Sequence, residues 1–188
     1  MTDYNTLPTD VVPAALKGRA IGAVFMAGFG ALWMIIGLKL LRRLHTGPLL
    51  VVLAITAVLV LAAIKQFEYA KTLPSSEGAA TSAQAAAIGH RFNMIFAAEL
   101  IAIFVAVVVL NALRRPTLIL PVVAVIVGLH FFPLARLFAA PVFYSTATAM
   151  VLSVLFAFSM RDVSRRQAAI GIGCGLILWI TSATLLWS

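Results

Sequence analysis

The stretches LKLLRRLHTGPLLVV at residues 38–52 and LNALRRPTLILPVV at residues 110–123 decide the fold class. Each places two arginines between apolar segments, and MRDVSRRQ at residues 160–167 does so a third time. A short basic turn between segments of about 20 apolar residues is typical of helices that cross roughly 30 Å of hydrocarbon. The sequence therefore predicts an all-α polytopic membrane protein, a bundle of six transmembrane helices arranged as three hairpins.

The expected organisation is a polar N-terminal lead over residues 1–16, followed by a single transmembrane domain over residues 17–188. Helix is the required form, because an open strand would leave unpaired backbone groups in lipid. A loop outside the membrane is expected around Pro74. The expected spans cover residues 20–38, 46–64, 92–113, 116–135, 137–160 and 167–188.

Composition excludes an ordinary soluble domain. Hydrophobic residues make up 63% of the chain and charged residues 11%, and the mean hydropathy is +1.08. Soluble domains are about half apolar and a quarter charged, so lipid must solvate much of this surface. The alternative is a helical core buried by partner subunits. The net charge of +8 lies at helix ends rather than along a polar face. It therefore predicts contact with membrane lipids and no nucleic-acid partner.

The distribution of basic residues predicts which side of the membrane each turn faces. Eight lie on the side of the three arginine turns with only Asp162 as a counter-charge, and six lie on the other side with four acidic residues. The positive-inside rule then places the arginine turns in the cytoplasm and both termini on the outer side of the membrane. Lys17 and Arg19, beside the first span, argue against this orientation.

Glu99 is the first candidate functional residue, because it interrupts the apolar third span within MIFAAELIAIF. An ionised carboxylate in lipid costs at least a few kcal/mol, so the side chain should face protein or water. One reading is a substrate- or proton-binding group. The other is a carboxyl group that packs between helices.

His130 is the second candidate, and it lies at a similar depth. It precedes Arg136 by six residues, about 9 Å, while Glu99 follows Arg91 by eight residues, about 12 Å, from the same side of the membrane. The two helices are consecutive, so we expect them to pack and the two side chains to meet. A carboxylate–imidazole pair can relay protons. The alternative for His130 is a hydrogen bond to a backbone carbonyl, which Pro133 would free at Leu129 by kinking or ending the helix.

Lys65, Asn93 and Arg136 complete the set of substrate- or proton-binding candidates, because they fall on the outer side with Glu99 and His130. Together with Gln66, Glu68, His90 and Arg91, they would line an outward-facing polar vestibule. The alternative is that the basic side chains extend to lipid headgroups. No spacing matches a metal-ligand motif, and the single cysteine, Cys174, lies in an apolar run. The sequence therefore predicts neither a metal nor a cofactor.

Small residues predict where helices approach closely. The pairs Gly18-xxx-Gly22 and Gly171-xxx-Gly175 have the spacing that lets two membrane helices touch. Trp33 is expected to pack between helices, as is Trp179 in the last span.

The segment VGLHFFPLARLF at residues 127–138, followed by PVFYSTATAM, resembles a segment of small, uncharacterised bacterial multi-pass membrane proteins. RFNMIFAAELIAIF at residues 91–104 fits the same pattern, so the resemblance covers residues 90–150. It implies a bacterial inner-membrane location and no particular activity.

The leading hypothesis is a small-solute or proton-linked transporter or channel that uses Glu99 and His130. The first alternative is a non-transporting membrane subunit or structural protein, in a homo-oligomer or with a partner membrane subunit. The second is a membrane-embedded enzyme acting on lipid. The sequence contains no HExxH and no nucleophile motif, so an enzyme is the less favoured reading.

Overall fold

The computed structural model describes residues 12–73 and 79–187, with side chains over residues 15–73 and 86–187. This part of the chain is all helical, in agreement with the predicted class. One 3-10 turn, Pro116–Leu118, precedes the fourth helix. The six helices are α1 (Val12–Leu40), α2 (Thr46–Thr72), α3 (Ala79–Ala112), α4 (Ile119–Leu137), α5 (Val142–Ala157) and α6 (Val163–Trp187).

Five of these helices are long and apolar enough to cross a membrane: α1, α2, α3, α4 and α6. The fifth expected span, over residues 137–160, is wrong in extent, because α5 has 16 residues and so is about 24 Å long. Pro141 caps its start, and Phe158 caps its end. The first, second and third helices extend beyond their expected spans, and Val12–Leu16 of the expected lead belongs to α1. The rest of that lead lies outside the described residues.

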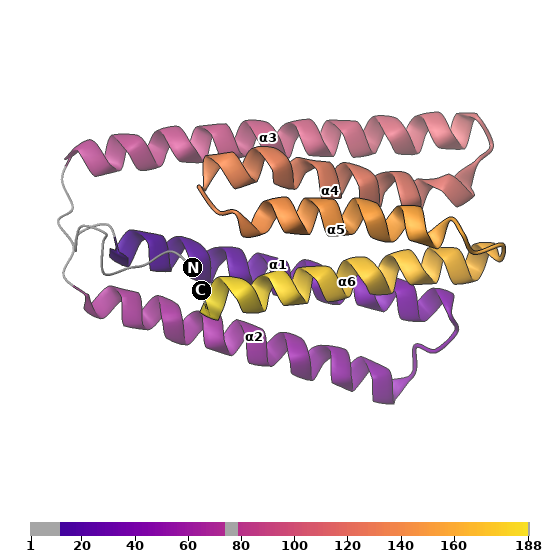
Figure 1. Cartoon of the computed structure of the whole chain (residues 1–188), viewed down its shortest axis with the longest axis horizontal. Helices are drawn as coiled ribbons and strands as arrows, with labels where there is room; N and C mark the ends of the chain where they lie inside the picture. The colour runs from indigo at the N-terminus through magenta and orange to yellow at the C-terminus, as the bar shows by residue number, and fades with distance from the viewer. Residues whose placement is uncertain (1–11, 74–78, 188) are drawn as a thin grey trace.

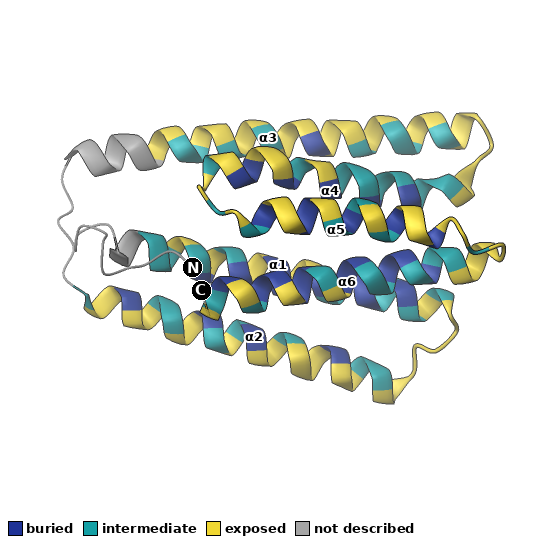
Figure 2. Cartoon of the chain, in the orientation of Figure 1, coloured by how far each residue is buried: buried dark blue, intermediate teal, exposed yellow. Residues whose placement is uncertain are grey.

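The helices lie side by side in the order α2, α1, α6, α5, α4, α3, each packed on the next (Figure 1). The two helices at the edges, α2 and α3, follow one another in the chain. Both are apolar over most of their surface and largely exposed, as Figure 2 shows. In a membrane this surface faces lipid or another protein, because water would not solvate it. The larger part of the core lies between the other four helices, and a second cluster packs Val52 and Leu59 of α2 against α1 and α6.

The three arginine turns lie together at one end of the molecule, and α1 begins and α6 ends at the other (Figure 1). Arg42 and Arg114 each have a φ of 55°, the left-handed region that ends many helices. The amide of the following arginine donates to a carbonyl five residues back, Arg43 to Leu38 at 3.0 Å and Arg115 to Leu110 at 2.8 Å. The repeated Leu-Arg-Arg sequence is therefore a repeated helix end.

The third arginine turn is built differently. The Asp162 side chain accepts a hydrogen bond from the amide of Arg165 at 2.7 Å, which is the usual cap of a helix N-terminus. This explains why MRDVSRRQ keeps its arginines without the proline of the other two turns: its arginines open a helix, whereas those of the first two turns follow one.

Four glycines bring α1 and α6 into backbone contact. A Cβ atom on Gly171 would lie 2.7 Å from Gly37 Cα, and one on Gly175 would lie 2.9 Å from the carbonyl oxygen of Gly30. The expected close approach at Gly171-xxx-Gly175 is present. That at Gly18-xxx-Gly22 is not: a Cβ on Gly18 would meet nothing within 4 Å, and one on Gly22 would meet only the Leu185 side chain at 3.4 Å.

Two side chains of α6 bond to backbone carbonyls of α1 at this crossing. Ser182 Oγ donates to the carbonyl of Ala23 at 2.8 Å, and Trp179 Nε1 donates to that of Ala27 at 3.2 Å. Each bonded carbonyl is already part of the α1 helix, so the two bonds tie intact helices together. On the other face of α6, Thr181 and Thr146 of α5 bring their hydroxyl oxygens to 2.7 Å. Trp33 and Trp179 are both buried, as expected.

Candidate functional site

Glu99 is the only buried side chain of α3 over residues 86–112, although the rest of that stretch is mainly apolar. Phe92 and Ile95 are half-buried against the core, and most other side chains of the stretch are exposed. The helix therefore turns its carboxyl group towards the protein, on the same side as Phe92 and Ile95, while most of its apolar side chains face outwards. This is the arrangement expected for a charge that avoids lipid.

The carboxyl group faces His130 of α4. Glu99 Oε1 lies 3.3 Å from His130 Nδ1, so the contact that helical counting predicts is present. The same Nδ1 lies 2.6 Å from the carbonyl oxygen of Val127, one turn earlier on α4. The expected backbone partner of His130 is thus Val127 rather than Leu129. The helix also continues past Pro133 to Leu137, so the early helix end considered at that proline is absent.

Two acceptors therefore compete for one ring nitrogen. A hydrogen on Nδ1 can point to the Val127 carbonyl or to the Glu99 carboxylate. A second proton can reside on Nε2 or on the carboxyl group, so the pair can exist in several protonation states. Both side chains are mostly shielded, with relative exposures of 16% for His130 and 8% for Glu99. In such a site a lone carboxylate would be poorly solvated, which favours states in which the pair retains a proton.

Aromatic rings fix α3 at the end away from the arginine turns. Phe92 of α3 has its ring centre 6.0 Å from that of Phe138, which follows α4. Phe138 contacts Phe143 of α5 at 6.3 Å, and Phe143 contacts Phe131 of α4 at 5.7 Å. These spacings are those of favourable aromatic pairs. The cluster joins three helices and holds α3 in the register that sets Glu99 beside His130.

A groove of about 360 Å³ opens between α3 and α4 at this same end. Its wall includes Arg91 and Arg136, one from each helix, together with Ile95 and Pro133. Ile95 is one turn from Glu99, and Pro133 is three residues from His130. Neither Glu99 nor His130 lines the groove. Within the described part of the chain, neither arginine forms an ion pair with a carboxylate.

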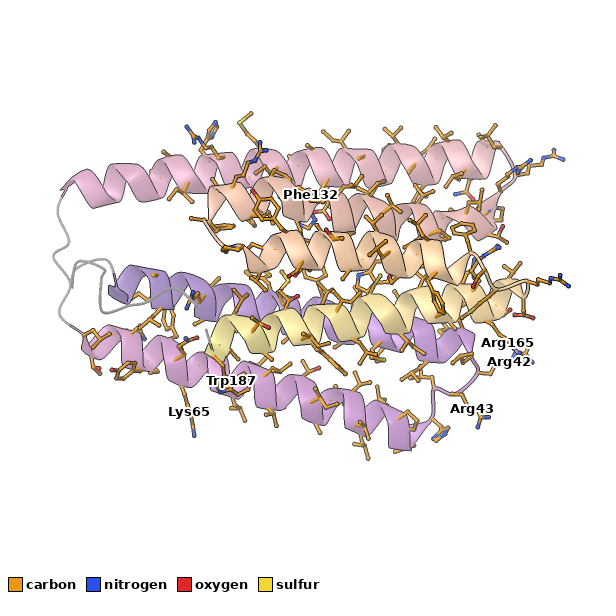
Figure 3. The ribbon with its side chains drawn as sticks, in the orientation of Figure 1. Arg42, Arg43, Lys65, Phe132, Arg165 and Trp187 are labelled. Atoms are coloured by element: carbon orange, nitrogen blue, oxygen red, sulfur yellow. The ribbon has the colours of Figure 1, made fainter. Side chains whose placement is uncertain are left out.

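The other candidates are placed differently. Arg136 lines the groove, whereas Asn93 is an exposed residue of α3 outside its wall. Lys65 is exposed on α2, which lies at the opposite edge of the molecule from α3 (Figure 3). The structure brings together Glu99 and His130, and brings Arg136 beside Arg91, but it does not bring Lys65 to them.

Sequence reasoning missed three features. Gly30 and Gly37 are seven residues apart, so they do not form the four-residue spacing that marks a close approach, and Ser182 looks like any other hydroxyl of a membrane helix. Arg91 was weighed only as part of a wider vestibule, although its pairing with Arg136 follows from the same count that pairs Glu99 with His130. Among the described residues no three histidine, cysteine or acidic side chains are grouped as a metal site would require.

Comparison of the chain with protein-family models, with curated proteins and with solved structures gives no match. The interpretation of the site therefore depends on its geometry.

Proposed function

We propose that this protein is a proton-linked transporter of a small solute in the bacterial inner membrane, with Glu99 and His130 as its proton-binding pair. The observation that carries the proposal is the 3.3 Å contact between these two side chains across the α3–α4 packing. Ionisable groups inside membrane helices are costly to maintain, and they mark proton or substrate paths more often than purely structural positions. A proton held by the pair is shared between two helices, so its loss changes how those helices attract each other.

The groove beside the pair supports an approach route for a charged solute. Arg91 and Arg136 give its wall two positive charges, with no carboxylate of the described residues paired to them. A solute in this groove would lie one turn from Glu99. The proton-binding pair and the solute would therefore share the α3–α4 packing, which is the arrangement that coupled movement needs.

The test is proton flux into liposomes that enclose a pH-sensitive dye, under an imposed proton gradient. Glu99→Gln keeps the size of the side chain but removes its titration, and we expect it to lower the flux at least ten-fold. Glu68→Gln is the matched control, because it makes the same change at an exposed carboxylate that pairs with Lys71 at 2.8 Å. Equal fluxes in the native chain, in Glu99→Gln and in protein-free liposomes would refute proton conduction through the pair.

A second candidate function is that of a non-transporting membrane subunit. The specific observation in its favour is that the groove between α3 and α4 does not reach Glu99 or His130, so the pair is compatible with a dry packing contact. In that case Glu99→Gln would leave flux at the protein-free level and would instead weaken the attachment of α3. Unfolding of the Glu99→Gln and Glu68→Gln variants in detergent separates the two functions. If Glu99 serves only as a proton site, the isosteric change to glutamine should alter the free energy of unfolding little.

We also propose how the chain crosses the membrane: six spans form three hairpins, with the arginine turns in the cytoplasm and both termini outside. It is supported by the packing of α1 on α2, α3 on α4 and α5 on α6, and by the gathering of the arginine turns at one end. Single cysteines at Ser164 and at Thr72 test it in intact cells, because native Cys174 is buried and gives little background. A membrane-impermeant maleimide should label the Thr72→Cys variant only. Labelling of Ser164→Cys alone would reverse the orientation.

A further inference from the structure

A second groove, of about 480 Å³, lies at the arginine end of the molecule, between the end of α1, α5 and α6. Its wall is apolar apart from Arg165 near the start of α6 and Ser153 on α5. Leu41, Phe156 and Ile172 are among the apolar residues that line it, one from each of the three chain segments. It is separate from the α3–α4 groove and shares no residue with it.

The length of this groove matches one leaflet of a bilayer. Along α6 it extends from Arg165 to Gly173, eight residues or about 12 Å. One leaflet contributes about 15 Å of hydrocarbon. With Arg165 at the level of the headgroups, the groove therefore follows the path of an acyl chain towards the middle of the bilayer.

The polar groups of the groove are divided between its two ends. At the deep end, Ser153 Oγ donates to the carbonyl of Met150 at 2.8 Å, so its hydroxyl is satisfied within its own helix. At the mouth, no carboxylate of the described residues forms an ion pair with the Arg165 guanidinium. The next residue, Arg166, lies over the Phe158 ring at 5.0 Å and does not line the groove. The groove thus offers a positive charge at its mouth and hydrocarbon contact below it.

We propose that this groove binds one anionic phospholipid, with an acyl chain against α5 and α6 and the phosphate against Arg165. The chemistry is complementary at both ends: a guanidinium binds phosphate through two parallel hydrogen bonds, and the apolar wall suits a hydrocarbon chain. This site does not depend on the proposed transport function.

Photo-crosslinking in lipid nanodiscs tests the proposal directly. The discs are made of phosphatidylcholine and carry a trace of either phosphatidylglycerol or phosphatidylcholine with a diazirine in one acyl chain. After illumination, peptide mass spectrometry maps the labelled residues. We expect the phosphatidylglycerol probe to label the segments 153–160 and 168–173 about five-fold more than the phosphatidylcholine probe, since one arginine near a membrane surface contributes about 1 kcal/mol.

Two pairs of variants separate charge from shape. Arg165→Gln should remove the difference between the probes, whereas Arg115→Gln, an exposed arginine of another turn at the same end, should preserve it. Ala169→Phe fills the groove and should lower labelling there by either probe. Ala102→Phe, at an exposed position of α3, should not. Arg165 is exposed, so its variant should keep the native fold, which size-exclusion chromatography checks.

Three results would overturn the proposal. Equal labelling of the two segments by both probes in the native chain would show that the groove does not distinguish an anionic lipid from a zwitterionic one. Labelling spread evenly over all lipid-facing helices would mean that no bound lipid is held there. An equal loss of preference in Arg165→Gln and Arg115→Gln would assign the effect to the overall charge of the arginine turns instead of this groove.

Discussion

Replacing Gly171 by alanine should push α1 and α6 apart. The added Cβ would lie 2.7 Å from both Cα and N of Gly37, and 3.0 Å from the carbonyl oxygen of Trp33. These neighbours are backbone atoms of a helix, so they cannot rotate away as a side chain would. Relief to an ordinary contact of about 3.4 Å requires the two helices to separate by roughly 0.7 Å.

That separation also strains the hydrogen bonds across the same helix pair. A 0.7 Å increase would lengthen the Ser182–Ala23 bond from 2.8 Å to about 3.5 Å and the Trp179–Ala27 bond from 3.2 Å to about 3.9 Å. Overpacking costs about 1–3 kcal/mol, and each membrane hydrogen bond contributes about 0.6 kcal/mol. The higher helix propensity of alanine offsets about 1 kcal/mol of this. The free energy of unfolding should therefore fall by about 1–3 kcal/mol.

Gly28→Ala in α1 is the matched control, because a Cβ there would meet nothing within 4 Å. It makes the same chemical change and gains the same helix propensity, so it should raise the free energy of unfolding by up to about 1 kcal/mol. Reversible unfolding in mixed micelles, followed by tryptophan fluorescence, measures both variants. Equal stabilities of Gly171→Ala and Gly28→Ala would refute the view that backbone contact holds α1 against α6.

Two further changes test the helix contacts and the helix ends. Ser182→Ala should lower the free energy of unfolding by about 0.6 kcal/mol, whereas Thr184→Ala, whose hydroxyl bonds to Ile180 of its own helix, should have a smaller effect in the same unfolding assay. Arg114→Gly should raise stability by about 1 kcal/mol, because the residue has a φ of 55° that glycine adopts without strain. Arg115→Gly, at a φ of −118°, should not, and an equal gain in both would argue against the left-handed helix end.

The features that the sequence predicts well are local or nearly so. Apolar length and basic turns identify the helices, and the tight turn at Arg114 makes α3 and α4 neighbours. The depths of Glu99 and His130 then follow from counting residues at 1.5 Å each. Arg91 and Arg136 come together for the same reason.

The features that the sequence predicts poorly depend on contacts between distant parts of the chain. Nothing in the local sequence pairs the first helix with the last, so the partners of Gly171 and Ser182 could not be identified. Lys65 was placed with Glu99 by depth alone, and depth does not specify which edge of the molecule a helix occupies. The end of α5 was set too late because apolar residues continue to Met160, whereas the helix stops at Ala157.

The placement of Glu99 as the only buried side chain of residues 86–112 has a consequence: the position of α3 and the binding of a proton at Glu99 can influence each other. The charge of Glu99 contributes to how this edge helix is held, beside the half-buried Phe92 and Ile95. Such coupling is reciprocal: if protonation shifts the balance between docked and loosened α3, then anything that displaces α3 must change proton affinity by the same factor. A lipid, solute or neighbouring protein that touches only the outer face of α3 would thereby act on a proton that it never contacts.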